Sequence, residues 1–526
     1  MDNLYTYSPI KRILLFSIYH IAGFVLKKLK IKKLCLSLLA LLILIYLLIY
    51  TKLLLKHSEK VKQDILQDFV QNPQKIVVTS WNSEPEYQEY HSINNTGNLA
   101  DIYLNEKLKV PWGFNQTCAR FPDLFDLQFR NNTWQLQKTT NGIFHLLNAY
   151  LDLRKGSLIR IVATYDVSKT QETFYCQFWY NNNSGPTVVS SEVPSLMFRS
   201  KWGVDNGYFK HPYLITCSVV LDNYHYPVSV SLVEQPCGNA SNNLKIFHKN
   251  VEKKKTCVVC VKGLFFPFVD KSTRLVEWIE LISLLGAEKI HFYKYSVHPN
   301  IKKILDYYVK KGLTEVTPFS LVGDFSNQPF LQGHFLEYMV SHRRLQEVVS
   351  YNDCLYKHLH QFEYVVLLDV DEMIVPLQAT WMELIRSLQK RYPSTTSFMA
   401  RNVYFFDSYL HEHDWFSDIP KHKYMLQDVY RARTDSKSVS HAKGFHRTEK
   451  VITLHNHLPI NCFQNCVTKT MNSTLTQLQH YHVNCTFGVG DCDTMKADSV
   501  LDNRVWQFKN KLIMNVQRTL GEVGLD

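Results

Sequence analysis

Apolar positions alternate along the first half of the chain in a way that predicts strands. Between about residues 80 and 244, β-branched and aromatic residues alternate or cluster between Gly, Asn and Ser breaks, as in LIRIVATYDV, TFYCQFWYNN and YPVSVSLVE. A period of two residues is typical of half-buried strands. We therefore predict a β-rich module over residues 80–250.

After residue 250, strand-like and helix-like segments alternate. CVVCVKGLFF, KIHFYKY, LTEVTPFSL and residues 364–368 read as strands, whereas STRLVEWIELISLLGA, PNIKKILDYYVKKG and residues 337–362 have helical spacing. Ser272 or Thr273 is the expected N-cap of the first helix, and Gly286 follows its end. Alternating strands and helices predict an α/β domain over residues 251–526 with a mixed, mainly parallel sheet.

One uncharged apolar run, LCLSLLALLILIYLLIYT, begins at residue 34 and is extended by Leu53 to Leu55. At about 1.5 Å per residue it reaches roughly the 30 Å of a bilayer core. We predict a cytoplasmic tail over residues 1–33, an uncleaved signal-anchor helix over 34–55 and a stem over 56–79. The shorter apolar stretch over residues 13–26 is predicted to be an interfacial helix.

The basic charge of the chain is concentrated beside that run. The formal net charge is +12, and residues 1–62 alone hold eleven Lys/Arg against Asp2 and Glu59. This distribution is typical of a membrane flank and argues against a nucleic-acid partner. We expect a single-pass type II membrane protein of the Golgi or the ER, with the part after the anchor on the lumenal side.

Cysteines and glycosylation sequons agree with a lumenal location. Eleven cysteines and seven N-x-S/T sequons follow the anchor, and an oxidising compartment allows the cysteines to pair. Cys176 and Cys217 lie on strand-like segments that they can bridge, and the odd count leaves at least one cysteine free or intermolecular. Cys257 and Cys260 form a CxxC on a strand that points them to opposite faces, so we expect no redox or zinc site there.

The sequence FEYVVLLDVDEMIVP, residues 362–376, runs from an apolar strand into three carboxylates. The segment is either an acidic turn or a binding site for a positively charged group. In a strand, Asp369 and Asp371 point the same way and Glu372 points the other way. Ligands bind beyond the carboxyl ends of parallel strands, so we predict a Mn²⁺ or Mg²⁺ site that holds a diphosphate leaving group. The second D-x-D, in GDCDT at residues 490–494, follows no strand and is interpreted as structural.

From about Thr256 to Leu520, the chain resembles glycosyltransferase family 92. The stretches that carry the resemblance are EWIELISLLGAEKIHFYKYS, ILDYYVKKGLTEV, LQEVVSYNDCLYKH, YVVLLDVDEMIVP, AKGFHRTEKVITLHNH and LQHYH. It implies a GT-A-type, Rossmann-like fold, and the preceding β-rich region is similar to the lumenal module of animal members. It also implies a metal-dependent, inverting transfer of a sugar, typically galactose from UDP-galactose, to a glycan of a glycoprotein or glycolipid. A fucose-bearing N-glycan is one candidate acceptor, and the oligomeric state is left open.

The same resemblance assigns roles to individual positions. The implied metal ligands are Asp369, Asp371 and His457. The implied nucleotide-sugar contacts are Asp369, Lys443 and His480. Two of these assignments stay open. His455 is an alternative to His457 as the metal ligand. His480 and Tyr481 are also compatible with a purely structural place in a buried core. The chain departs from the family at Thr448, which replaces a usual proline, and at His482, which replaces a usual arginine.

An inverting transfer also needs a base that deprotonates the acceptor hydroxyl. The acidic residues in the expected interval are Asp407, Glu412, Asp414, Asp428 and Asp435. We predict Asp414 and Asp435 as the first choices. The alternative function is a catalytically weak or inactive lumenal glycan-binding protein of the same fold. A metal-dependent phosphate hydrolase is disfavoured, because such sites recruit ligands from more strand ends.

Overall fold

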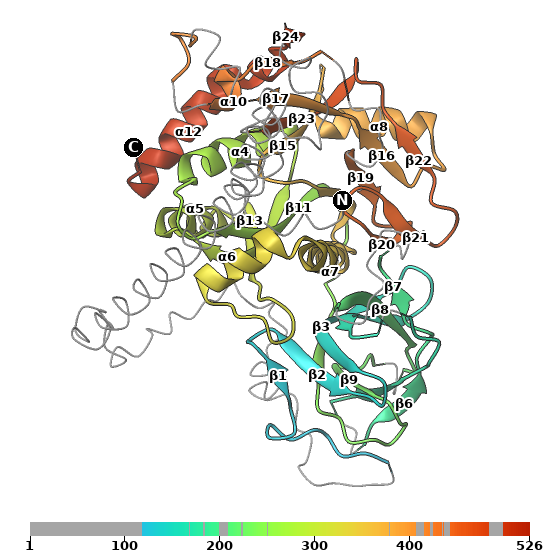
Figure 1. Cartoon of the computed structure of the whole chain (residues 1–526). Helices are drawn as coiled ribbons and strands as arrows, with labels where there is room; N and C mark the ends of the chain where they lie inside the picture. The colour runs from blue at the N-terminus through green and yellow to red at the C-terminus, as the bar shows by residue number, and fades with distance from the viewer. Residues whose placement is uncertain are drawn as a thin grey trace, which may run out of the picture. The chain divides into compact units, whose positions relative to one another are not determined.

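The computed structural model describes residues 118–525 (Figure 1), except 168, 182–184, 199–208, 222–224, 250, 378, 407–414, 421–423, 434, 436–441 and 483–497. The predicted tail, anchor and stem lie outside these residues, as does the GDCDT segment. Within the described part of the chain, no helix is long and apolar enough to cross a bilayer.

The first half of the described chain consists of strands, as its alternating pattern predicted. They form one sheet of ten strands in which β6-β5-β9-β10-β3-β4-β8-β7 are consecutive neighbours and β2 joins β1 to β3. The strands are β1 (Phe129–Arg130), β2 (Trp134–Lys138), β3 (Ile143–Asp152), β4 (Leu158–Tyr165), β5 (Tyr175–Trp179), β6 (Thr187–Ser190), β7 (Ser195–Leu196), β8 (His211–Ser218), β9 (Ser229–Val233) and β10 (Leu244–Phe247).

The second half is built on a mixed sheet of seven strands in the order β13-β12-β11-β14-β19-β16-β22. The first four strands are mutually parallel, and β19 is antiparallel to both of its neighbours. The strands are β11 (Lys255–Phe266), β12 (Lys289–Val297), β13 (Thr314–Pro318), β14 (Phe362–Leu367), β16 (Ser397–Ala400), β19 (Lys443–Arg447) and β22 (Thr468–Thr470). The predicted α/β class with parallel βαβ units is confirmed.

A second, five-stranded sheet lies in the order β15-β23-β17-β18-β24, and β20 pairs with β21 alone. These strands are β15 (Glu372–Pro376), β17 (Asn402–Phe406), β18 (Tyr430–Ala432), β20 (Val451–Leu454), β21 (Pro459–Cys462), β23 (Thr476–His482) and β24 (Ser499–Leu501). The register pairs Glu372 with His480 and Tyr404 with the same histidine. The five-stranded sheet therefore places His480 of β23 beside the acidic segment.

Helices connect and cover the strands of the second half (Figure 1). They are α4 (Ser272–Leu285), α5 (Pro299–Lys310), α6 (Pro329–Tyr338), α7 (Val340–His358), α8 (Trp381–Arg391), α10 (Tyr424–Gln427), the 3₁₀ helix η4 (Arg504–Phe508) and α12 (Lys509–Val523).

Two predicted details of the helices were wrong. Helix α4 begins at Ser272, and the side chain that receives the Ser272 backbone N–H is that of Asp270, at 2.9 Å. A carboxylate before the first turn thus caps the helix from outside. The helix expected over residues 337–362 is instead two helices, α6 and α7, with a break at Met339, whose backbone (φ −93°, ψ 57°) is not helical.

The β-rich half and the α/β half share one of the three hydrophobic clusters of the described chain. Trp134 and Tyr150 of the first half belong to the same buried cluster as Val258, Leu355 and other residues of β11, α7 and β20. Hydrogen bonds cross the same boundary: the Trp134 indole donates to the Ser320 carbonyl at 3.2 Å. The contacts are those of a continuous interior.

At the centre of this shared core, the carboxylate of Asp353 on α7 is completely buried and accepts three hydrogen bonds. Oδ1 accepts from Asn148 Nδ2 at 2.8 Å and from the Tyr150 hydroxyl at 2.6 Å, both on β3. Oδ2 accepts from the Tyr293 hydroxyl on β12 at 2.5 Å. Burial and the Asp353 charge raise the pKa of both tyrosines, so they stay protonated and donate.

Four disulfides lie in the described part of the chain: Cys118–Cys237, Cys176–Cys217, Cys260–Cys354 and Cys462–Cys466. The predicted Cys176–Cys217 bridge is among them. Cys257 is a free thiol in the core, and burial raises its pKa, which keeps it inert. The two cysteines of the CxxC thus have separate surroundings, as the strand assignment predicted.

Candidate functional site

The acidic segment after β14 is a turn. The backbone N–H of Glu372 donates to the Asp369 carbonyl at 3.0 Å, so the chain reverses over four residues instead of continuing as a strand. The Glu372 carboxylate folds back, and its Oε2 accepts the Asp369 backbone N–H at 3.0 Å. The prediction that Glu372 points away from the site was wrong, because it assumed that strand geometry persists through residue 372.

Two lysines hold the carboxylate of Asp369 from opposite neighbouring strands. Oδ2 lies 3.2 Å from Lys262 Nζ on β11 and 3.3 Å from Lys443 Nζ on β19. Burial alone would raise the pKa of Asp369, but the two ammonium groups hold it below its usual range. Asp369 is therefore ionised at neutral pH and tied down through one oxygen.

The other oxygen of Asp369 is different. Oδ1 is buried and accepts no hydrogen bond. An ionised oxygen without a donor is costly inside a protein, and carboxylate oxygens are the ligands that Mn²⁺ and Mg²⁺ prefer. Asp371 follows two residues later with a side chain that is 44% exposed. These two carboxylates fit a divalent cation.

Lys262 reaches the site because of how β11 packs on α7. Cys260 and Lys262 are two residues apart on the strand and share one face, and Cys260 is bonded to Cys354 of α7. Glu347 lies two helical turns before Cys354 on the same face of α7, and its Oε1 is 3.4 Å from Lys262 Nζ. The disulfide thus fixes the register that pairs Lys262 with Glu347.

His480 closes the other side of the acidic turn. Its Nε2 lies 3.6 Å from Asp371 Oδ2, and its Nδ1 lies 3.7 Å from Glu372 Oε1 and 3.3 Å from Asn402 Nδ2. Burial alone would lower the pKa of His480, but Asp371, Glu372 and Asp369 raise it. The three carboxylates thus favour the charged form of the His480 ring.

His457 lies in the turn between β20 and β21. Its Nδ1 donates to the Ala442 carbonyl at 3.0 Å, which leaves Nε2 with a free lone pair, the arrangement usual for metal-binding histidines. Burial and the Lys443 charge lower the pKa of His457 to about 3, so the ring is neutral. The alternative, His455, packs against Phe198 with ring centroids 5.4 Å apart.

A cavity of about 1110 Å³ opens beside the acidic turn. Its wall includes Lys262, Asp369, Asp371 and His480. Further cations that line it are Lys271, Arg274 and Arg343. Aromatic rings that line it are Phe265, Phe266, Phe268, Tyr295, Phe330, Tyr338 and Tyr481. Cations that face carboxylates, beside a set of aromatic rings, suit an anionic ligand with a flat ring.

The two candidate bases have different outcomes. Asp414 lies outside the described residues, together with Asp407 and Glu412. Asp435 is described: its Oδ2 lies 3.4 Å from Arg401 Nη1, and it is not part of the cavity wall. Asp428 is completely buried near β18.

The departure at Thr448 has a structural explanation. The Thr448 backbone N–H donates to the Glu363 carbonyl at 3.0 Å, and its hydroxyl donates to the Phe362 carbonyl at 2.7 Å. A proline would lack this N–H, so threonine adds a bond between the end of β19 and the start of β14. His482 ends β23 opposite Phe406.

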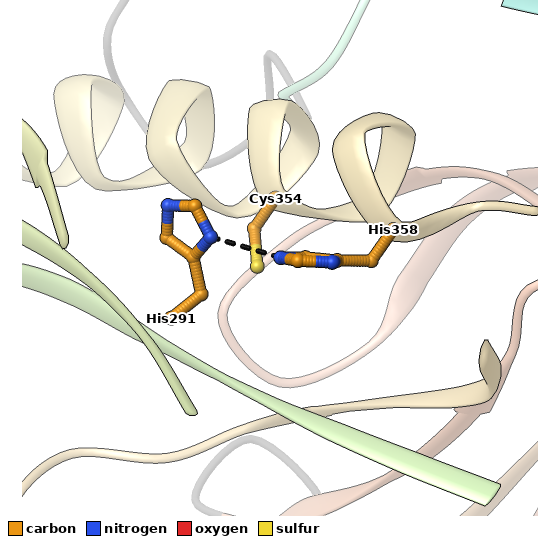
Figure 2. A group of neighbouring side chains, drawn as sticks. All are labelled: His291, Cys354 and His358. Carbon is orange, nitrogen blue, oxygen red and sulfur yellow. Dashed lines mark hydrogen bonds between the residues drawn. The ribbon is translucent and has the colours of Figure 1, made fainter. Parts of the chain in front are cut away.

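A second group of ligand-type side chains is buried under α7 (Figure 2). One ligand atom each of His291, Cys354 and His358 lie within 4.8 Å of one another, and no other such group of three is found among the described residues. The Cys354 sulfur is used by the disulfide with Cys260. His291 Nδ1 is hydrogen-bonded to His358 Nε2 at 2.8 Å. The group is a structural contact and not a metal site, and the described carboxylates of the acidic turn do not gather as tightly around His457.

Sequence reasoning missed Lys262 and Glu347 and excluded Glu372. A signal for Lys262 was present: it is the charged residue inside the apolar run CVVCVKGLFF, on the strand that pairs with β14. In a parallel sheet, such a position lies beside the end of the acidic strand. Glu347 has no comparable signal, because its place depends on the packing of α7.

Comparison with known families agrees with this geometry. The model of glycosyltransferase family 92 matches residues 255–520, just over half of the chain. The match starts at the first residue of β11 and ends inside α12, so it contains the acidic turn, both lysines and His480. Comparison with curated proteins gives no significant match. The chain belongs to glycosyltransferase family 92.

Proposed function

We propose that this glycosyltransferase is a metal-dependent, inverting enzyme that transfers galactose from UDP-galactose to a glycan of a glycoprotein or glycolipid, a fucose-bearing N-glycan being the first acceptor to test. The observation that carries the metal dependence is the buried, unbonded Oδ1 of Asp369 beside the half-exposed Asp371. The apolar run over residues 34–55 supports a type II protein anchored in the Golgi or ER membrane.

The proposed metal ligands are Asp369, Asp371 and His457, with Mn²⁺ or Mg²⁺ as the cation. When bound, the cation would neutralise the negative charge that develops on the departing diphosphate. The turn fixes both aspartates, and the Ala442 carbonyl fixes the tautomer of His457 that leaves Nε2 free.

The residues proposed to hold the nucleotide sugar are Asp369, Lys443 and His480. Lys443 is enclosed between Asp369 and Glu372, which raise its pKa against the effect of burial and keep it charged. His480 faces the cavity between Asp371 and Glu372. His480 lines the cavity, whereas Lys443 is 1% exposed and not part of the cavity wall. Lys443 would therefore act on the diphosphate through its fixed positive charge, which needs no reorganisation during the transfer.

An inverting transfer requires a carboxylate on the acceptor side that removes the proton of the attacking hydroxyl. Asp414 and Asp435 remain the proposed candidates. The Asp435 carboxylate is paired with Arg401 and is not part of the cavity wall, and Asp414 lies outside the described residues.

The test uses the full-length protein and its Asp369→Asn/Asp371→Asn variant, incubated with Mn²⁺ and a panel of UDP-sugars, with fucosylated N-glycans as acceptors. We expect transfer or slow donor hydrolysis by the unmodified protein, at least about a hundredfold less by the variant, and no loss in an Asp306→Asn control on the exposed face of α5. Absence of turnover with every donor would reject the enzyme and favour glycan binding. Equal activity of the double variant would reject the metal assignment.

A further inference from the structure

Lys262 stands between two carboxylates that both line the cavity. Its Nζ is 3.2 Å from Asp369 Oδ2 and 3.4 Å from Glu347 Oε1. Glu347 is itself held from its own helix by Arg343, whose Nε lies 3.7 Å from the same Oε1. Lys262 therefore has a firmly placed second partner that does not belong to the acidic turn.

The other lysine on Asp369 has a second partner too. Lys443 Nζ lies 3.0 Å from Glu372 Oε2. Each cation that neutralises Asp369 is thus shared with a further carboxylate. Either lysine can release Asp369 without becoming a buried, unpaired charge, the situation that is strongly unfavourable in a protein interior.

Exposure distinguishes the two lysines. The Lys443 side chain is 1% exposed, whereas that of Lys262 is 28% exposed and forms part of the cavity wall. Only Lys262 therefore has open space into which its ammonium group can turn. A ligand in the cavity is also within reach of its flexible four-carbon stem.

A divalent cation on Asp369 would be a neighbour of both lysines. Like charges a few ångströms apart in a partly solvated protein site repel each other, and a doubly charged ion repels an ammonium group more strongly than a singly charged one does. The ion pair between Lys262 and Asp369 thus opposes metal binding in the unloaded site.

On the basis of the proposed function, we propose that Lys262 is a stand-in cation. It neutralises Asp369 while the site is unloaded, and it turns about Glu347 to contact the diphosphate of the nucleotide donor once Asp369 binds a divalent cation. Glu347 is a positioning residue, because it holds the ammonium group beside the cavity in both states. The lysine thus weakens binding of the metal alone and strengthens binding of the metal together with the nucleotide.

The first measurement is the affinity of the full-length protein for Mn²⁺ without nucleotide, from the paramagnetic resonance signal of free Mn²⁺. Lys262→Met and Lys262→Gln are expected to bind Mn²⁺ at least about tenfold more tightly than the unmodified protein, which equals about 1.4 kcal/mol. The control, Lys303→Met, removes the same charge from the exposed face of α5 and is expected to leave the affinity unchanged.

The second measurement is UDP binding by calorimetry at saturating Mn²⁺. The affinity of Lys262→Met and Lys262→Gln for UDP is expected to fall by about tenfold or more. Glu347→Gln is expected to bind Mn²⁺ more weakly, because Lys262 then has Asp369 as its remaining partner. This variant provides a test that keeps the lysine, should the neutral replacements fail to fold.

Two results would overturn the inference. If the unmodified protein binds Mn²⁺ and UDP but Lys262→Met and Lys262→Gln bind Mn²⁺ no more tightly, the stand-in role is rejected while the proposed function stands. If the unmodified protein binds neither Mn²⁺ nor UDP, the proposed function and the inference are rejected together.

Discussion

The ammonium group of Lys443 lies 3.0 Å from the carboxylate of Glu372, and the two side chains are 1% and 4% exposed. A buried ion pair contributes little by comparison with a well-packed apolar pair, but removal of one partner leaves an uncompensated charge. This pair joins β19 of the seven-stranded sheet to β15 of the five-stranded sheet. The acidic turn is therefore anchored at the boundary between these two sheets.

Removal of one member of that pair is expected to destabilise the protein. Lys443→Met should lower the free energy of unfolding by about 3–5 kcal/mol, measured by denaturant unfolding. Lys302→Met, which breaks the exposed pair with Asp306 on α5, should cost less than about 1 kcal/mol. The double variant Lys443→Met/Glu372→Gln should recover part of the loss, since it removes both charges. If the double variant loses as much free energy of unfolding as Lys443→Met and Glu372→Gln lose together when measured singly, the direct coupling of Lys443 and Glu372 is contradicted.

The Asp353 cluster predicts that the two halves unfold together. Asp353→Asn replaces one acceptor oxygen by a donor that faces tyrosine or asparagine donors. We expect a loss of about 2–4 kcal/mol, because hydrogen bonds to a buried charged group are among the stronger ones. Denaturant unfolding followed by tryptophan fluorescence should show a single transition, shifted to lower denaturant. Two separate transitions, or a stability equal to that of Asp306→Asn, would contradict the prediction.

The buried histidine pair predicts a loss of stability in weak acid. Burial lowers the pKa of His358 to about 4, and the facing groups are Glu315, Lys357 and His291. Its pKa in the unfolded chain is about 6.5. Because the folded-state pKa is the lower one, the unfolded chain binds the proton first as the pH falls. This contribution to stability is fully present above about pH 6.5 and is lost as the pH falls from there to about 4.

The measurement is denaturant unfolding of the unmodified protein and of His358→Gln at pH 7.5 and pH 5. The glutamine does not titrate and can still hydrogen-bond to His291, so the variant should lose less stability between the two pH values. The difference expected from one histidine is about 2 kcal/mol. Identical pH dependence of the two proteins would show that His358 does not carry the effect.

Gly263 is predicted to tolerate no side chain. A β-carbon at this position would lie 2.0 Å from a ring carbon of Tyr295, so Gly263→Ala forces the tyrosine ring to move at the cavity wall. We expect a loss of about 1–3 kcal/mol in the free energy of unfolding. Gly263→Ala/Tyr295→Leu should restore most of it. Gly185→Ala, which meets nothing within 4 Å, is the matched control and should be neutral.

Much of this fold follows from periodicity in the sequence. The three alternating segments became the strands β4, β5 and β9, and the helical spacing after Ser272 and Pro299 became α4 and α5. These elements were predictable because their buried faces repeat at a fixed interval. The break at Met339 was not, since residues on both sides of it favour a helix and the interruption comes from the local backbone.

The candidate site was predictable only where it depends on sequence neighbours. Asp369 and Asp371 could be placed at the end of a parallel strand from the apolar run before them. Glu372 could not, because its direction depends on a turn that the carboxylate itself stabilises by accepting the Asp369 N–H. Lys262 and Glu347 come from elements about 85 residues apart, and their meeting depends on the packing of α7 on β11.

The core that the two halves share has a consequence for how this protein can have changed over evolutionary time. Trp134, Tyr150 and Leu214 fill the same interior as Val258, Leu355 and Val451. A gene rearrangement that transferred the α/β half alone would expose this apolar surface and leave Asp353 without the donors of β3. The two halves are therefore expected to be inherited as one block. An exchange of domains between relatives is expected to require compensating changes where α7 contacts β3, β4 and β8.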